Sequence, residues 1–377
     1  MTALRVITSE GAPATLEEAT VQSFADSLRG RLLQRGDDGY DEARKLFNGM
    51  IDRRPALIAQ CLGAADIAAA VRFAREHNLI VSIKGGGHSV TGNAVCHGGL
   101  MIDPSRMKSI RVDPAQQTVR AEPGMLGGEL DRETQAFGLS TPVGSVSSTG
   151  ISGLTLGGGQ SWLASKHGLA IDNLLSVDIV TADGTLRTAS ATRHEDLFWG
   201  VRGAGHNFGV VTSFEYRLRP VGPVLGGMMI LPLSQAVEAL RFYRDFTASQ
   251  PDALQTWAGL LTLPDGNQVL AIVPCYLGSL AEGERADSPA TAVRKPGRGH
   301  GRSTTLRHDA ADLRPRLSAG TAQLLEIGAG RPPHRRAHRS ERRTRAKGAL
   351  AAHPHSLYRD ARSLSPRRQN GYGLLPP

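Results

Sequence analysis

Three glycine-rich stretches hold most of the residues whose types and spacing could do chemistry. They read KGGGHS at residues 84–89, SSTGISGLTLGGGQSW at 147–162 and RGAGHNFGVVT at 202–212. Glycine turns let backbone N–H groups approach a phosphate or pyrophosphate, and a neutral imidazole is a nucleophile near pH 7. The first stretch places His88 directly after three glycines. It therefore indicates a ligand held close to the backbone, with a histidine beside it.

Several common site types are excluded because their motifs are missing. The chain contains no GxxxxGK[ST], no strict GxGxxG, no HExxH and no GxSxG, which removes the P-loop, the Rossmann dinucleotide site, the zincin and the common serine-hydrolase interpretations. Its three cysteines, Cys61, Cys96 and Cys275, form no CxxC pair. This argues against a disulfide scaffold and a tetrathiolate zinc site and fits a reducing compartment. We expect no metal.

The elements that would position these stretches are a mixture of helices and hairpins. Apolar spacing predicts a helix over 64–77, followed by a strand over 79–83. Hairpins are expected over 110–123 and around the Asp-Gly turn at 183–184, with a helix at 128–138 and a strand at 209–219. After Gly222 a strand and a helix follow again, so we expect a second domain there. This order predicts an α+β fold. Trp162 and Trp199 are expected in the core.

Four segments together carry a family resemblance: IKGGGHSVTGN, GLMIDPSRMKSIRVDP, STGISGLTLGGGQSWLASKHGLAIDNL and DLFWGVRGAGHNFGVVTSFEYRL. They resemble the FAD-linked oxidases of the berberine bridge enzyme type, which share the FAD-binding domain of the vanillyl-alcohol oxidase and p-cresol methylhydroxylase family. The resemblance extends from about residue 50 to residue 285. It implies a two-subdomain FAD-binding domain at 1–222 and the start of an α+β substrate domain at 223–285.

The resemblance also implies site residues. In the family the flavin pyrophosphate lies on the glycine turn, and the following histidine, here His88, is bonded covalently to the 8α-methyl of FAD. Many relatives add a cysteine tether where this chain has Val146, which predicts a single tether. His206 either lies near the glycine turn or has a structural role. The residues expected at the cofactor are Gly85, Gly86, Gly87, His88, Ser89, Ser147, Gly150 and Gly153, with Val210 and Val211 on the adenine side.

The implied activity is that of an oxidase. A hydride passes from a small alcohol, sugar or secondary metabolite to FAD, and O₂ then accepts the electrons. No residue of 223–285 matches a catalytic base, so the base is not assigned. No apolar run approaches the ~18 residues of a membrane span, so we expect a cytoplasmic protein with a small-molecule substrate and with no membrane or nucleic-acid partner.

The C-terminal tail, residues 286–377, differs from the rest of the chain. It holds 17 Arg, 2 Lys and 6 acidic residues, a net charge of +13, which leaves −4 for the preceding 285 residues. Val, Ile, Leu, Phe, Met and Trp supply only 12 of its 92 residues, fewer than a folding domain needs. A frameshift near codon 286 would explain this composition and would give a truncated, inactive flavoprotein. The other alternative is a genuine basic tail that binds nucleic acid or a membrane.

Overall fold

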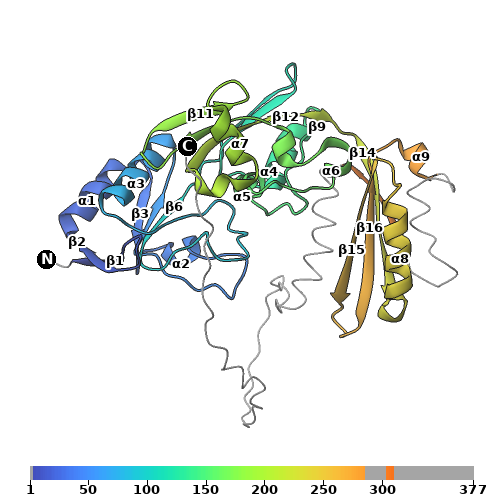
Figure 1. The fold of residues 1–377 in the computed structure, drawn as a ribbon, viewed down its shortest axis with the longest axis horizontal. Helices are drawn as coiled ribbons and strands as arrows, with labels where there is room; N and C mark the ends of the chain where they lie inside the picture. Colours follow the sequence, from blue (N-terminus) through green and yellow to red (C-terminus); the bar gives the residue numbers. More distant parts are fainter. Residues whose placement is uncertain (1–2, 285–302, 310–377) are drawn as a thin grey trace, which may run out of the picture. The chain divides into compact units, whose positions relative to one another are not determined.

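The computed structural model describes residues 3–284 and 303–309 (Figure 1). A hairpin of β1 (Leu4–Ile7) and β2 (Pro13–Leu16) precedes a four-stranded sheet of order β3-β4-β6-β5. In this first sheet β4 and β5 pair in parallel with β6, whereas β3 is antiparallel to β4. Its strands are β3 (Arg31–Gln34), β4 (Leu57–Gln60), β5 (Val81–Ile83) and β6 (Leu100–Asp103).

The two central strands of the first sheet are buried on both faces, as expected of apolar parallel strands. Helices α1 (Glu18–Ser27) and α3 (Ala64–Glu76) pack on one face through Phe24, Ile67 and Phe73. The short helix α2 (Tyr40–Ala43) packs with Ile58 and Met101 of the other face. Strand β5, at the edge of this sheet, ends where the first glycine turn begins.

The second sheet is antiparallel, with the order β11-β10-β12-β8-β7. Helices α4, α5 and α7 share its core, which includes the fully buried Phe214 and Tyr216. The strands are β7 (Ile110–Asp113), β8 (Thr118–Ala121), β10 (Leu174–Val180), β11 (Leu186–Ser190) and β12 (Val210–Arg217). The helices are α4 (Gly127–Gln135), α5 (Ile151–Leu156) and α7 (Glu195–Ala204), while α6 (Ala164–His167) and the 3₁₀ turns Ala170–Asp172 and Gly205–Asn207 lie between strands. The two-residue strands β9 (Leu139–Ser140) and β13 (Arg219–Pro220) pair beside it.

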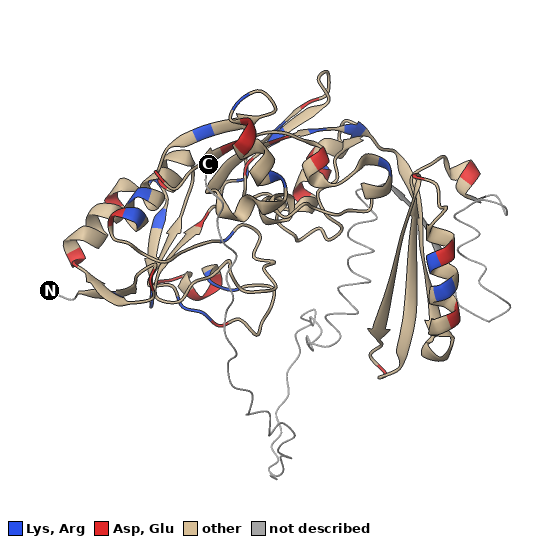
Figure 2. Ribbon diagram, in the orientation of Figure 1, with Lys and Arg blue, Asp and Glu red and all other residues tan. Residues whose placement is uncertain are grey.

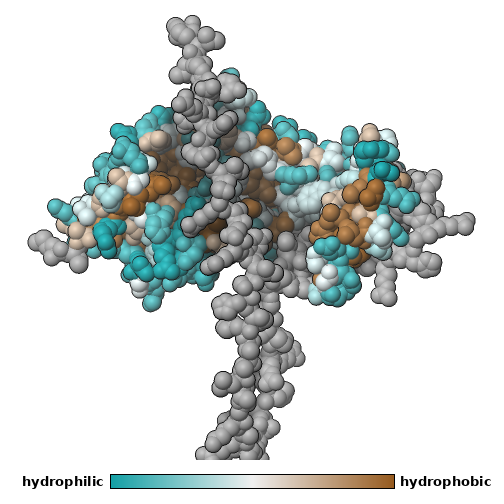
Figure 3. Space-filling model, turned by 60° about the horizontal axis from the view of Figure 1, so that its bottom comes forward, coloured by the Kyte–Doolittle hydropathy of each residue, from teal (hydrophilic) through white to brown (hydrophobic). Residues whose placement is uncertain are grey.

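The third sheet begins directly after Gly222. Its strand order is β15-β16-β14-β17, and α8 packs on one face around Leu254 and Ile272. On the other face Trp257 stacks on Trp162, with ring centroids 4.3 Å apart. Apolar side chains remain on the surface of this part of the molecule, brown on the right of Figure 3. The elements are β14 (Pro223–Pro232), the 3₁₀ turn Leu233–Gln235, α8 (Ala236–Thr247), β15 (Leu254–Thr262), β16 (Gln268–Tyr276), α9 (Leu280–Glu284) and β17 (Ser303–Asp309).

The helices and strands expected from the sequence are present. The predicted helix at 64–77 is α3, and the two predicted hairpins are β7–β8 and β10–β11. One expectation is wrong: Trp199 is 76% exposed, because α7 turns Phe198 and Val201 into the core instead. No helix in the described part of the chain is long and apolar enough to cross a membrane. Apart from β17, the predictions for the tail at 286–377 fall outside the described residues, and the domain boundaries stay predictions.

Candidate functional site

The three glycine-rich stretches meet around one cavity of about 680 Å³. The cavity lies at the carboxyl ends of β5 and β6, where open α/β sheets commonly bind ligands, and the start of α5 and the loop before β12 complete its wall. Nine of the ten residues predicted at the cofactor line it: Gly85, Gly86, Gly87, His88, Ser89, Gly150, Gly153, Val210 and Val211. The tenth, Ser147, is not among the lining residues; its carbonyl oxygen accepts a hydrogen bond from the Gly128 N–H at the start of α4.

Two of the glycine turns touch each other through their backbones. A Cβ atom added to Gly86 would lie 2.3 Å from the Gly150 nitrogen, and one added to Gly150 would lie 2.5 Å from the Gly86 nitrogen. A Cβ on Gly85 would meet the Ser152 hydroxyl at 2.3 Å. Real side chains do not approach backbone this closely, so Gly86 and Gly150 require glycine for the contact between the turns, independently of any ligand, whereas at Gly85 the Ser152 side chain would have to move.

The first turn also presents an array of free hydrogen-bond donors. Within the described residues, no hydrogen bond uses the backbone N–H groups of residues 85–89. Consecutive free N–H groups in a turn form a concavity that binds anions such as phosphates. These five amides fit the pyrophosphate of a dinucleotide cofactor.

Gly153 gives a second observation that fits a bound group. It lies on α5 at the cavity wall, and a Cβ added there would meet no atom within 4 Å. Its φ is ordinary, so backbone conformation does not require glycine here, and alanine would be the better helix former. No described residue explains the missing methyl group, whereas a ligand lying against α5 would.

His88 projects from the first turn against the segment before α5. Its Nε2 lies 3.2 Å from the Ser148 hydroxyl, and its Nδ1 lies 3.5 Å from the Thr149 hydroxyl. One face of the ring stacks on Phe47, with centroids 4.6 Å apart and planes 10° apart. Burial lowers the pKa of His88 below its ordinary value, so the imidazole is neutral at pH 7, the form that is nucleophilic.

The remaining wall carries no charged side chain. The lining residues include His206, whose Nε2 lies 3.2 Å from the Gly153 carbonyl oxygen, but no Asp, Glu, Lys or Arg. His206 therefore belongs to the cavity and also holds α5. Thr149 and Ser152 line it too and fall inside a glycine-rich stretch, so the sequence could have indicated them. Phe47 gave no signal, because nothing in its local sequence connects it to His88.

Comparison with known proteins identifies this architecture. Residues 55–190 match the family model of the FAD binding domain. The chain is similar to curated FAD-linked oxidoreductases. It is 41% identical to (R)-6-hydroxynicotine oxidase of Paenarthrobacter nicotinovorans over 51% of this chain and 42% of that protein. The chain spans about half the length of the curated relatives it matches, for example 58%, 42% and 44% of three of them.

Solved structures agree with the family expected from the sequence. 6-Hydroxy-D-nicotine oxidase from Arthrobacter nicotinovorans matches with a TM-score of 0.71 and 32% identity, over 78% of this chain and 64% of that one. A carbohydrate oxidase from Microdochium nivale matches with a TM-score of 0.69 and 27% identity, over 79% and 64%. The berberine-bridge-enzyme-like protein 1 of Physcomitrella patens, 23% identical with a TM-score of 0.72 over 83% and 68%, shares the fold. The expected fold class and resemblance are thus confirmed.

Proposed function

We propose that the protein is an FAD-dependent oxidase that removes a hydride from a small alcohol, sugar or secondary metabolite, with O₂ as the final acceptor. The observation that carries this proposal is the juxtaposition, in one cavity, of five free backbone N–H groups at residues 85–89 with the imidazole of His88. The relatives support the reaction class, since they include a 6-hydroxynicotine oxidase and a carbohydrate oxidase.

Each part of the cavity has a role in holding the cofactor. The amides of residues 85–89 bind the pyrophosphate, the open surface at Gly153 admits a flat group against α5, and Val210 and Val211 line the wall for the adenine side. When bound, FAD supplies the hydride acceptor, and the protein supplies binding and orientation. The described residues that line the cavity include no carboxylate, and we assign no base that takes a substrate proton.

We further propose that His88 is covalently attached to FAD, and that it is the only tether because Val146 is not a cysteine. Attachment forms a C–N bond between a ring nitrogen of His88 and the 8α-carbon of the flavin and breaks one C–H and one N–H bond. Two electrons and two protons pass to O₂, which leaves as H₂O₂. The lowered pKa of His88 favours this step because the attacking nitrogen needs its lone pair.

The test of attachment uses the purified full-length protein. We expect a mass increment of one FAD on a peptide that contains His88, yellow colour that persists after acid precipitation, and no cysteinyl-flavin adduct. His88→Ala should still bind FAD but should release all of it in acid. If acid releases the flavin from the wild-type protein, covalent attachment is wrong, while reversible FAD binding would still support the rest of the proposal.

The oxidase activity needs a separate test. H₂O₂ release should be measured with secondary amines, primary alcohols and oligosaccharides, and at least one class should support turnover with flavin reduction under anaerobic conditions. An FAD-loaded protein that none of these reduces would favour an inactive, truncated flavoprotein. This alternative is supported by the composition of residues 286–377.

A nucleic-acid-binding function would depend on the basic tail. The charged residues of the described elements are interspersed rather than gathered by sign, as on α8 in Figure 2. Residues 1–285 have a net charge of −4, so this part of the chain has no excess of positive charge to attract nucleic acid. Salt-sensitive DNA binding that is lost on removal of 286–377 would support this alternative. The cytoplasmic location stays a prediction.

A further inference from the structure

The loop at residues 44–55 lies against the turn that carries His88. The Phe47 N–H donates to the Gly87 carbonyl oxygen at 2.9 Å, and the Asn48 amide donates to the Val90 carbonyl oxygen at 2.9 Å. These bonds reach the residue before His88 and the second residue after it. The loop therefore fixes the backbone on both sides of the histidine.

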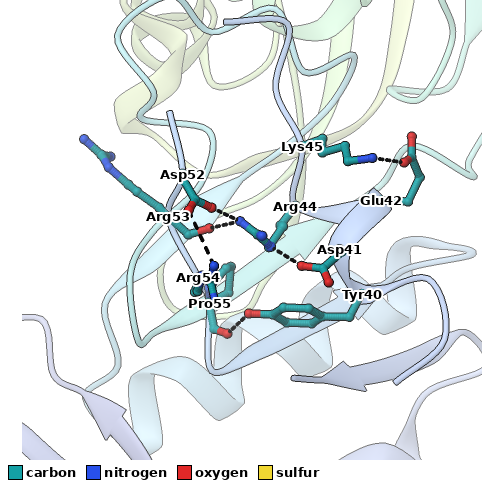
Figure 4. A network of polar contacts seen from close by, with 9 residues as sticks. All are labelled: Tyr40, Asp41, Glu42, Arg44, Lys45, Asp52, Arg53, Arg54 and Pro55. Carbon is teal, nitrogen blue, oxygen red and sulfur yellow. Dashed lines mark hydrogen bonds and ion pairs between the residues drawn. The ribbon is translucent and has the colours of Figure 1, made fainter. Parts of the chain in front are cut away.

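An ion-pair network holds this loop in place (Figure 4). The guanidinium of Arg44, only 14% exposed, pairs with Asp41 at 2.7 Å and with Asp52, and it also donates to the Arg53 carbonyl oxygen at 3.2 Å. Arg44 thus joins helix α2 at the start of the loop to its far end. The Tyr40 hydroxyl strengthens the closure, because it donates to the Pro55 carbonyl oxygen at 2.6 Å. A loop tied at its base in this way presents its tip in one position.

Phe47 at this tip has no role in a hydrophobic core. Its side chain is 60% exposed and belongs to none of the apolar clusters of the described residues, although its neighbours Leu46 and Ile51 do. Its one ring contact is the stack on His88, at 4.6 Å and 10°. Ser148 and Thr149 lie at the nitrogen edges of the same imidazole. The stack on Phe47 therefore restricts the tilt of the His88 ring, and the two hydroxyls restrict the positions of its nitrogen atoms.

We infer that Phe47 is a positioning residue that holds the imidazole of His88 in the orientation needed to bond to FAD. The inference rests on the covalent attachment proposed above and extends it to a residue outside the glycine turns. Bond formation between groups held in place is fast because their orientation is settled before reaction. Without Phe47 the ring of His88 keeps only its contacts with the Ser148 and Thr149 hydroxyls and is less restricted in orientation, whereas the amides that bind the pyrophosphate are unchanged.

The test compares variants of the full-length protein, expressed under riboflavin limitation and then incubated with FAD. Acid-stable flavin should form about tenfold more slowly in Phe47→Ala than in the wild type, while reversible FAD affinity and the melting temperature stay the same. Phe47→Tyr keeps the aromatic ring and should restore the rate, but Phe47→Leu should not. Phe137→Ala is the matched control, because Phe137 is also an exposed phenylalanine, at 52%, and does not line the cavity.

A measurement without flavin separates positioning from general damage. In the apoprotein, loss of the stacked ring should move the side-chain NMR signals of His88 downfield in Phe47→Ala and leave them unmoved in Phe137→Ala. The role of Phe47 is overturned if flavin attaches to Phe47→Ala as fast as to the wild type. It is also overturned if Phe47→Leu and Phe47→Tyr attach flavin at equal rates, or if the His88 signals do not move in Phe47→Ala. None of these results would contradict covalent attachment itself. Absence of acid-stable flavin in the wild type would overturn both.

Discussion

The two glycines Gly86 and Gly153 should respond in opposite ways to the same substitution by alanine. At Gly153 the added methyl group meets no protein atom within 4 Å. Replacing a helical glycine with alanine then stabilises the fold by about 0.5–1 kcal/mol, because the unfolded chain loses conformational freedom and the helix gains a better former. At Gly86 the methyl group would lie 2.3 Å from a nitrogen of Gly150. That overlap is with rigid backbone, so the two turns must separate, at a cost of about 3 kcal/mol.

Gly153→Ala should weaken FAD binding even though it stabilises the fold. A methyl group on the cavity wall occupies space that the ligand needs, and we expect Gly153→Ala to weaken reversible FAD binding about tenfold, or ~1.4 kcal/mol. Gly86→Ala should weaken it as well, because the turn that carries the free amides moves. Stability and affinity therefore change in opposite directions at Gly153 and in the same direction at Gly86.

The assay combines chemical denaturation of the apoprotein with FAD titration. Both substitutions are made in a His88→Ala background, so that binding stays reversible and an equilibrium constant can be measured. The reasoning about Gly153 is refuted if its alanine variant binds FAD as tightly as the parent, since the open space would then not face the ligand. Unchanged stability of Gly86→Ala would refute the close contact between the turns.

Three further outcomes follow from buried polar groups. Thr155→Val should lower the free energy of unfolding by about 1–3 kcal/mol, because it leaves the fully buried Tyr216 hydroxyl without its 2.8 Å partner. Tyr216→Phe should lower it by less, and urea denaturation of both variants compares the two values. Asp66→Ala should lower the free energy of unfolding by about 3 kcal/mol or more, since the buried carboxylate of Asp66 accepts hydrogen bonds from three backbone N–H groups. Urea denaturation measures this change too. NMR titration of the apoprotein should give His88 a pKa below the ordinary value of 6.5, so the rate of flavin attachment should fall only as the pH drops through that lowered pKa.

Many helices and strands of this fold can be predicted from local sequence patterns. The spacing of Ile67, Ala70 and Ala74 predicts the face of α3 that is buried, and the Asp-Gly turn at 183–184 predicts the β10–β11 hairpin. Trp199 shows where such reasoning stops. Its size and apolar character favour burial, but its position on α7 places it on the solvent side of the helix, opposite Phe198 and Val201. Residue type alone does not determine which face of a short helix is covered.

The site shows the same division between what composition reveals and what only geometry reveals. Three glycine-rich stretches indicate a ligand, but they do not distinguish the reasons for the glycines. Gly86 and Gly150 allow the two turns to make close backbone contact, whereas Gly153 leaves open space at the cavity wall. A glycine that touches backbone and a glycine that touches nothing look the same in a sequence. Phe47 presents the converse case, because its ring partner among the described residues, His88, is distant in the chain, and Arg44 closes the loop at 44–55 that carries Phe47. Such a contact exists only once α2 and the end of β5 have been brought together, so it is a property of the fold rather than of any motif.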